Sequence, residues 1–276
     1  MDLRLPSPLR RLDDERLGGV TLFLKRDDLI HPDFPGNKWR KLKYNLQAAR
    51  DENHRTLLTF GGAFSNHLQA TAAAGHHFGF RTIGIVRGEE HTPLNPVLAR
   101  ARALGMTLAY VDRARYRDKN GIQAELRERY GDFHLIPEGG ANRHALRGCA
   151  ELVAEIDRDF DVLCFSSGTG ATLAGAATAL GEHQRAVGFS ALKGDFLDGE
   201  VRRLQAEYGR ATGNWAIDGR FHFGGFAKRD KTLTDFVDDF RARHGIALDP
   251  VYEGKMMYAI LAGRVFPPGT TLVAVI

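Results

Sequence analysis

The sequence predicts an α/β protein in which mostly parallel strands alternate with helices. Three observations support this fold class. Short apolar runs alternate with helical stretches along most of the 276 residues, the 31 glycines gather in clusters, and two of these clusters directly follow apolar runs. Apolar strands that alternate with helices are typical of a parallel sheet covered by helices. Clustered glycine indicates tight turns and close backbone approach, often to a ligand.

The expected strands are short and apolar, and they cover residues 21–25, 56–60, 81–86, 107–111, 133–136, 161–165, 185–190 and 271–276. The expected helices lie mostly between them, at residues 37–50, 66–79, 93–104, 118–130, 143–158, 171–182, 195–208, 230–243 and 254–262. Thr92-Pro93 places a proline in a first helical turn, and Asn142 precedes an apolar-periodic run. Both features mark helix starts.

The chain length suits one large domain or two smaller ones that share a cleft. The predicted division gives a small lobe at residues 45–157 and a large lobe made of residues 1–44 together with 158–276. Ligands of such folds bind between the lobes, at the carboxyl ends of strands.

Composition and charge argue against several classes of protein. Hydrophobic residues make up 43% of the chain and charged residues 26%, which allows a core to be buried. The net charge is +4, and basic residues neither form long runs nor interleave with aromatic ones, so nucleic-acid binding is not expected. Cys149 and Cys164 form no CxxC pair, which favours a reducing compartment. Without a signal peptide or membrane span in view, we expect a cytoplasmic protein.

A phosphate-binding loop is one interpretation of residues 164–175, CFSSGTGATLAG. A strand runs into Ser-Ser-Gly-Thr-Gly, and a helix is expected from Ala171. The glycines let successive N–H groups point into one concavity, and Ser167, Thr169 and Thr172 add hydroxyl donors. The stretch is neither a Walker loop nor a GxGxxG fingerprint, because the lysine and the third glycine are missing. An ordinary strand-to-helix turn stays open as the alternative.

Two further stretches place polar side chains at expected helix starts. In GGAFSNH, Ser65, Asn66 and His67 crowd behind a Gly-Gly, which suits a flat polar ligand, although one of them can simply be an N-cap. In DPVYEGK, Tyr252 can donate a proton or stack on a ring, and Glu253 can face a ring nitrogen. A favourable contact with the helix dipole, worth up to about 1 kcal/mol, also explains Glu253.

Lys38, in FPGNKWRKL, is either a solvated charge or a buried reactive amine. Surface lysines greatly outnumber catalytic ones. Together with the phosphate loop and the Asn66 motif, however, this lysine points to pyridoxal phosphate, which needs an amine whose charge is suppressed by burial or by nearby cations. The other histidines, such as His31, His76 and His77, show no metal-ligand spacing, so no metal site is expected.

Six motifs in the right order resemble the 1-aminocyclopropane-1-carboxylate deaminase / D-cysteine desulfhydrase family, which is of the tryptophan-synthase-β type (fold type II) of pyridoxal-phosphate enzymes. The motifs are LFLKRDDL, GNKWRKL, GGAFSNH, PEGGAN, SSGTGATLAG and DPVYEGK. The resemblance covers nearly the whole chain. It implies a two-lobed α/β fold with the cofactor in the inter-lobe cleft, and it implies a homodimer.

The resemblance also implies which residues bind the cofactor. Lys38 matches the lysine that binds it covalently, Asn66 the residue that hydrogen-bonds its phenolic oxygen, and Glu253 the residue that faces its pyridine nitrogen. The phosphate loop would consist of Gly168, Thr169, Gly170, Ala171 and Thr172.

For the substrate, the resemblance implies a small amino acid that loses a β-substituent and yields a 2-keto acid and ammonia. Ser65, Asn66 and His67 match the motif beside the substrate carboxylate and the reacting carbon. Tyr252 matches an active-site tyrosine. The catalytic residues would therefore be Lys38, Ser65 and Tyr252.

One departure from the family bears on the substrate. Deaminases that open the cyclopropane ring carry a second tyrosine shortly before the C-terminal motif, whereas HFGGFAKRD has only Phe223 and Phe226 there. Glu253 nevertheless resembles the deaminases, since many desulfhydrase-like members have threonine at that position. The missing tyrosine weighs more, because it concerns the reaction unique to the deaminase. We therefore expect a D-cysteine desulfhydrase-like enzyme, with the deaminase as the alternative.

A second departure lies at the C-terminus. The family continues beyond its last strand into a His-Thr-Gly-Gly turn, whereas this sequence stops at Ile276. Either the sequence is truncated or one wall of the cofactor site is missing. The second explanation would suit a non-catalytic protein that binds the cofactor or an amino acid. A nucleotide-binding enzyme that uses residues 166–172 is the last alternative, and it lacks a Walker lysine and a ribose-binding acid.

Overall fold

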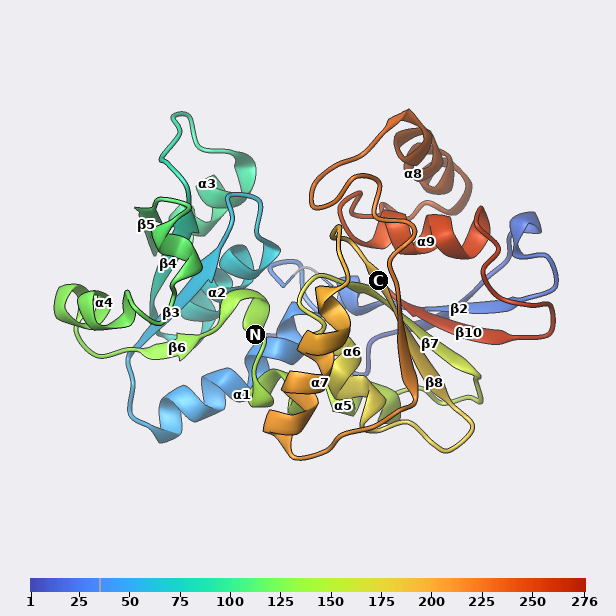
Figure 1. The fold of residues 1–276 in the computed structure, drawn as a ribbon, viewed down its shortest axis with the longest axis horizontal. Coiled ribbons are helices and arrows are strands. Elements are labelled where there is room, and N and C mark those ends of the chain that lie inside the picture. Colours follow the sequence, from blue (N-terminus) through green and yellow to red (C-terminus); the bar gives the residue numbers. More distant parts are fainter. Residues whose placement is uncertain (35) are drawn as a thin grey trace.

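The computed structural model describes residues 1–34 and 36–276, and it shows two sheets with helices on both faces of each (Figure 1). The strands are β1 (Leu9–Leu12), β2 (Thr21–Lys25), β3 (Thr56–Gly61), β4 (Arg81–Arg87), β5 (Met106–Val111), β6 (His134–Ile136), β7 (Val162–Ser167), β8 (Arg185–Ser190), β9 (Trp215–Asp218) and β10 (Thr271–Val275). The helices are α1 (Lys38–Asp51), α2 (Asn66–Phe78), α3 (Pro96–Ala103), α4 (Gln123–Tyr130), α5 (Arg143–Ala154), α6 (Ala171–Ala177), α7 (Phe196–Tyr208), α8 (Lys231–His244) and α9 (Glu253–Leu261).

The larger sheet has the strand order β1-β2-β10-β7-β8-β9, and the smaller sheet has the order β5-β4-β3-β6. β1 pairs antiparallel with β2, and the other described pairings are parallel. The predicted α/β fold with mostly parallel sheets is confirmed. The sequence did not predict β1 and β9, which are the two edge strands of the larger sheet. An edge strand pairs on one side only, and neither LRRL nor WAID forms the continuous apolar run of a central strand.

Helices cover both faces of each sheet. α5, α6 and α7 pack on one face of the larger sheet, and α8 and α9 pack on the other. In the smaller sheet, α1, α2 and α3 cover one face and α4 covers the other. Leu57 and Leu58 of β3 are both fully buried, one in each layer. Successive strand residues point to opposite faces, so a strand buried on both faces needs a continuous apolar run.

The start of α3 corrects one prediction. The sequence placed a helix start at Pro93, but this residue lies in a loop, and α3 begins at Pro96 with Asn95 as its N-cap. The Asn95 side chain accepts hydrogen bonds from the N–H groups of Val97 and Leu98, at 3.0 and 3.1 Å. Proline does occupy the first turn of this helix, as the rule predicts, but the residue is Pro96 and not Pro93.

The strands of the two sheets come from different parts of the chain. The four strands of the smaller sheet lie within residues 45–157, and those of the larger sheet lie outside this range. α5 also falls within 45–157, yet it packs against α6 and α7 on the larger sheet. The exact boundaries of the lobes stay a prediction.

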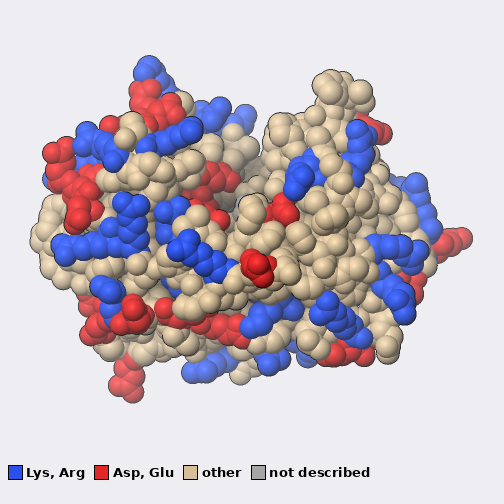
Figure 2. All heavy atoms as spheres, turned by 180° about the vertical axis from the view of Figure 1, so that it is seen from behind, with Lys and Arg blue, Asp and Glu red and all other residues tan. Residues whose placement is uncertain are grey.

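The face opposite to that of Figure 1 is hollowed between the two halves of the molecule (Figure 2). Basic and acidic side chains are interspersed over this face, without the broad basic stripe that a nucleic acid would need. None of the helices in the described part of the chain is long and apolar enough to cross a membrane.

Candidate active site

The predicted site residues come from the starts of four helices. Lys38 is the first residue of α1, Asn66 of α2, Ala171 of α6 and Glu253 of α9. The first turn of a helix has free N–H groups and the positive end of the helix dipole. Contacts between these segments bring the four helix starts to one place. Such an arrangement favours an anionic ligand.

Lys38 links two of these segments through its neighbour. Its Nζ donates a hydrogen bond to Asn37 Oδ1 at 3.1 Å, and Asn37 Nδ2 donates to Thr172 Oγ1 at 3.0 Å. Burial lowers the pKa of Lys38, while the negative charges of Glu253 and Asp249 act against this shift. A larger share of the amine is therefore neutral than in a solvated lysine, and the neutral amine is the form that acts as nucleophile or base. Pro35, in the predicted Pro-Gly turn before Lys38, lies outside the described residues.

Arg40, two residues after Lys38, anchors α1 in a buried cluster of charges. Its guanidinium contacts Asp27 at 2.6 Å and Glu155 at 2.8 Å. Lys25 also contacts Glu155, at 2.9 Å, and Ser7 Oγ donates to Asp27 at 2.7 Å. The cations lower the pKa of Glu155 to about 2 although its burial acts in the opposite direction. The cluster joins the N-terminal segment, β2, α1 and α5 directly behind Lys38.

The stretch from Gly168 to Thr172 makes a sharp turn from β7 into α6. Gly170 has a φ of +74°, and a Cβ atom on it would lie 2.7 Å from Val201 Cγ2, so a side chain does not fit there. Thr169 Oγ1 is buried and has no hydrogen-bond partner among the described residues. An unpaired buried hydroxyl costs about 1–3 kcal/mol, and a phosphate oxygen would pair with it. The loop therefore fits the phosphate of the expected cofactor.

The PEGGAN segment packs against this loop and against α2. A Cβ atom on Gly139 would lie 2.6 Å from Thr169 Cγ2, and one on Gly140 would lie 3.2 Å from His67 Cε1. Both glycines also have positive φ values, of +66° and +69°. Lys41 Nζ donates to the carbonyl oxygen of Gly139 at 3.2 Å. The two glycines thus allow a third segment to approach the site closely.

His67 is buried and held as a neutral imidazole. Thr59 Oγ1 donates its hydrogen to the Ile136 carbonyl at 2.8 Å, so it accepts from His67 Nε2 at 3.0 Å. His67 Nδ1 is then an unprotonated acceptor, and it has no partner among the described residues. Burial, with the Lys41 and Lys38 charges, lowers the pKa of His67 to about 3. The ring can accept a hydrogen bond near neutral pH, but it has no proton to give from Nδ1.

Ser65 and Asn66 begin α2. Ser65 is the N-cap, and its Oγ accepts from the Leu68 N–H at 3.3 Å. Asn66 Nδ2 donates to Asp249 Oδ2 at 3.0 Å. The other oxygen of Asp249 accepts from the Val251 N–H at 2.6 Å. Asp249 therefore ties the start of α2 to the turn that precedes α9.

Glu253 has a carboxyl group that titrates near neutral pH. Burial raises its pKa to about 7, the Asp249 charge adds to the rise, and a hydrogen bond from the Asp249 N–H at 2.9 Å together with the Lys38 charge opposes it. A Cβ atom on Gly36 would lie 3.4 Å from Glu253 Oε1, so this carboxyl stands beside the turn before Lys38. Near neutral pH it can hold or release a proton.

Tyr252 lies on the phosphate loop. A Cβ atom on Gly168 would be 3.1 Å from Tyr252 Cε1. Burial raises the pKa of the Tyr252 hydroxyl, which therefore stays protonated. The ring of Phe226 stands edge-on to Tyr252, with 6.1 Å between the ring centres, whereas Phe223 packs on Tyr258 at 5.0 Å. Of the two phenylalanines in the HFGGF stretch, Phe226 is the one at the site.

The structure thus brings all the predicted site residues into one connected cluster. It also adds three that sequence reasoning did not single out as site residues, namely Asn37, Lys41 and Asp249. Asn37 stands directly before Lys38 in GNKWRKL, and Asp249 opens DPVYEGK, so both motifs contained the signal. Lys41 follows Lys38 by one helical turn, which places it on the same face of α1.

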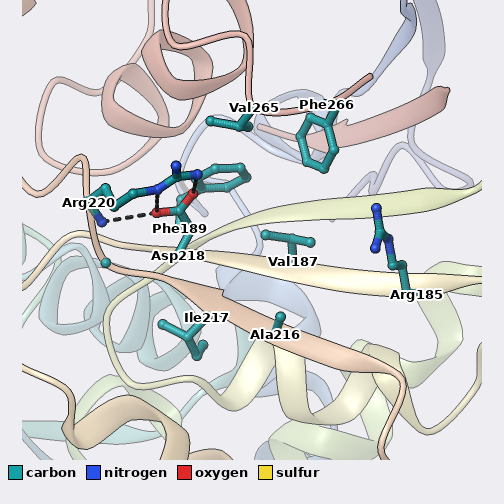
Figure 3. A pocket seen from close by; sticks show the side chains of 10 residues that line it. Arg185, Val187, Phe189, Ala216, Ile217, Asp218, Arg220, Val265 and Phe266 are labelled. Carbon is teal, nitrogen blue, oxygen red and sulfur yellow. Dashed lines mark hydrogen bonds and ion pairs between the residues drawn. The ribbon is translucent and has the colours of Figure 1, made fainter. Parts of the chain in front are cut away.

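A separate groove lies on the larger sheet (Figure 3). It runs along β8 and β9 below Val265 and Phe266, and Arg185 stands at one end. Asp218 and Arg220 form an ion pair in it, at 2.7 Å. No predicted site residue is among those that line the groove. The groove is therefore separate from the cluster of candidate site residues around Lys38.

Comparisons with known proteins give matches over nearly the whole chain. A family model described as pyridoxal-phosphate dependent enzyme matches residues 1–276. A Thermotoga maritima protein, provisionally named 1-aminocyclopropane-1-carboxylate deaminase, is 30% identical over 92% of this chain and 88% of its own length. An Arabidopsis thaliana protein named bifunctional D-cysteine desulfhydrase/1-aminocyclopropane-1-carboxylate deaminase, mitochondrial, is 28% identical over 93% of this chain and 71% of its own length. The crystal structure of an ACC deaminase homologue superposes with a TM-score of 0.84 at 26% identity and covers 99% of this chain and 89% of that one.

Proposed function

Because the chain belongs to the family of pyridoxal-phosphate-dependent enzymes, we propose that it eliminates the β-substituent of a small amino acid, with D-cysteine as the representative substrate. With water as the co-reactant, the products are a 2-keto acid, ammonia and the released β-substituent, which is hydrogen sulfide for D-cysteine. One observation carries the proposal. Lys38, an amine whose pKa is lowered by burial, lies next to a glycine-rich loop that contains the unpaired Thr169 hydroxyl.

Four groups hold the cofactor in this proposal. Lys38 would bind its carbonyl carbon, the loop of residues 168–172 would hold its phosphate, Asn66 would contact its phenolic oxygen and Glu253 its ring nitrogen. When bound, pyridoxal phosphate stabilises the negative charge that develops on the α-carbon of the substrate. The contacts of Asn66 and Glu253 with Asp249 support this arrangement, because they hold both side chains near Lys38.

The chain's own residues bind the substrate and move its protons. Lys38, which would be a free neutral amine once the substrate's amine has taken its place on the cofactor, takes the proton from the α-carbon. Ser65 Oγ and the free N–H groups at the start of α2 bind the substrate carboxylate. His67 can only accept at Nδ1, so it positions the start of α2 rather than binding a carboxylate. Tyr252, which stays protonated, donates a proton to the leaving group.

Opening of 1-aminocyclopropane-1-carboxylate is the second candidate reaction. The presence of Glu253 and the names of the relatives favour it. Phe226 argues against it, because its phenyl ring stands beside Tyr252 and cannot transfer a proton. We therefore rank elimination first.

The test measures keto-acid release by the purified protein with added pyridoxal phosphate. D-cysteine should yield pyruvate, and 1-aminocyclopropane-1-carboxylate should yield little 2-oxobutyrate. Lys38→Ala should lower turnover by about 10²–10⁴-fold or more, since it removes the group that transfers the proton. Lys43→Ala is the matched control, because Lys43 lies on the same helix and contacts Glu151 and the Tyr44 ring at the surface. Full turnover by Lys38→Ala would refute the proposal, and 2-oxobutyrate as the main product would favour the deaminase.

We also propose a homodimer that works in a reducing compartment such as the cytoplasm. The dimer is supported by the family resemblance alone. The compartment is supported by Cys149 and Cys164, which are both buried and unpaired. Light scattering that gives the monomer mass of 30.6 kDa would contradict the dimer.

A further inference from the structure

A second cluster of ionisable side chains lies outside the candidate active site, where α1 ends. Glu52 follows the last residue of α1, His54 precedes β3, and His134 is the first residue of β6. Glu52 Oε2 lies 2.9 Å from His134 Nδ1 and 3.3 Å from His54 Nε2. Two imidazoles therefore point a ring nitrogen at the same carboxylate oxygen.

These distances are close to those around a tetrahedral metal ion. Bonds of 2.0–2.1 Å to Zn²⁺ place neighbouring ligand atoms about 3.3 Å apart. A small rotation of Glu52 would open the contact to this value, and its side chain is 51% exposed and free to turn. Two imidazole nitrogens and one carboxylate oxygen form a donor set that Zn²⁺ prefers, and solvent can fill the fourth position.

Asp132 supports the same interpretation, because it contacts the other nitrogen of the His54 ring. Its Oδ2 lies 2.7 Å from His54 Nδ1. A neutral imidazole has a single N–H, so a neutral His54 cannot donate to Asp132 and to Glu52 at once. If Nδ1 donates to Asp132, Nε2 turns its lone pair toward the Glu52 oxygen. A cation between these two atoms removes the repulsion, and a carboxylate behind the ring is the usual partner of a metal-binding histidine.

Another histidine cluster fits an ion less well. His31, Asp33 and His77 also have ligand atoms within 4.8 Å of one another. However, His31 Nδ1 already accepts the Asp33 N–H at 3.1 Å, and the Asp33 carboxylate contacts Arg100 at 2.8 Å. An ion there would face a guanidinium group and compete with an existing hydrogen bond.

We propose that Glu52, His54 and His134 bind one divalent transition-metal ion of the Zn²⁺ class, with Asp132 holding His54 in orientation. The ion would join the end of α1 to β6. The chain after β6 forms the PEGGAN segment that packs on the active site, so the ion would fix the support of that segment without touching the reacting groups.

The test uses the full chain with its cofactor bound and without a histidine tag, and Co²⁺ as the probe, since its visible absorption reports tetrahedral coordination. We expect one Co²⁺ per chain, displaced by Zn²⁺. His54→Ala should abolish this signal. Asp132→Asn changes a side chain that is 70% exposed, so the fold should persist, and it should weaken Co²⁺ binding by about 10–100-fold.

The matched control is Asp159→Asn. Asp159 contacts His183 at 3.1 Å on the surface, in the same kind of pair but without a second histidine. Its Co²⁺ affinity should equal that of the unchanged protein. Three results would each overturn the proposal: no Co²⁺ bound, equal affinity in Asp132→Asn and the unchanged protein, or loss of binding in His77→Ala while His54→Ala still binds. The last result would place the ion at His31, Asp33 and His77.

Discussion

Replacing Glu253 by glutamine should remove a group that titrates near neutral pH in the cofactor-free protein. The carboxyl accepts a hydrogen bond from the Asp249 N–H at 2.9 Å, and its pKa is raised to about 7, chiefly by burial. A glutamine side chain has nearly the same shape, and its amide oxygen can accept the same hydrogen bond. The substitution Glu253→Gln therefore removes the charge and keeps the turn.

The magnitude follows from the two pKa values. The folded pKa of about 7 exceeds the ordinary value of 4.5 by about 2.5 pKa units. Each pKa unit corresponds to about 1.36 kcal/mol, so the difference changes the free energy of unfolding by about 3 kcal/mol. Because the folded pKa is the higher one, the folded state binds more protons between about pH 4.5 and pH 7. The free energy of unfolding therefore falls as the pH rises through this window. In Glu253→Gln this fall of about 3 kcal/mol should be absent.

Two measurements check this expectation. Urea unfolding should be measured between about pH 5 and pH 8. As the pH rises toward about 7, the free energy of unfolding of the wild-type protein should fall relative to that of Glu253→Gln. Infrared spectra should show a protonated carboxyl band that disappears with a midpoint near pH 7 in the wild type and is missing from the variant. Asp249→Asn should lower that midpoint only in part, because burial is the larger cause of the shift. Parallel stability curves for wild type and Glu253→Gln would refute the reasoning.

Three further substitutions test other parts of the site. Thr169→Val should weaken cofactor binding by about tenfold, because it removes a hydroxyl that would contact the phosphate, and it should not lower the stability of the cofactor-free protein. An unchanged affinity in a cofactor titration would count against the phosphate loop. Phe226→Tyr adds a hydroxyl beside Tyr252 and should raise 2-oxobutyrate release from 1-aminocyclopropane-1-carboxylate, relative to pyruvate from D-cysteine, by about tenfold or more. Arg40→Met leaves Asp27 and Glu155 without their main partner and should lower the free energy of unfolding by about 3–5 kcal/mol, so a loss below about 1 kcal/mol would contradict the role of the cluster.

The fold was predictable where burial leaves a clear apolar pattern in the sequence. The predicted strand at residues 56–60 became β3, and its apolar run reflects burial on both faces. β1 and β9 carried no such signal because edge strands pair on one side only. The start of α3 was wrong because the choice between two nearby prolines depends on the cap that Asn95 supplies.

The site was predictable where residues are close in the sequence. Motifs around Lys38, Asn66 and Glu253 gave its main members. The contact between Asn66 and Asp249 joins residues 183 positions apart, and that between Glu52 and His134 spans 82 positions. Spacing along the chain shows neither contact, since the first depends on how α2 meets the turn before α9 and the second on the pairing of β3 with β6.

The buried charge cluster at Arg40 holds the Lys38 amine in place before the cofactor and substrate bind. Arg40 fixes α1 two residues after Lys38, so local opening of this part of the helix would expose charges that have lost their partners. Amide hydrogen exchange along this part of α1 should therefore require opening of the whole fold. Cofactor and substrate would meet an amine that is already in place, and their binding would lose little conformational entropy in ordering it.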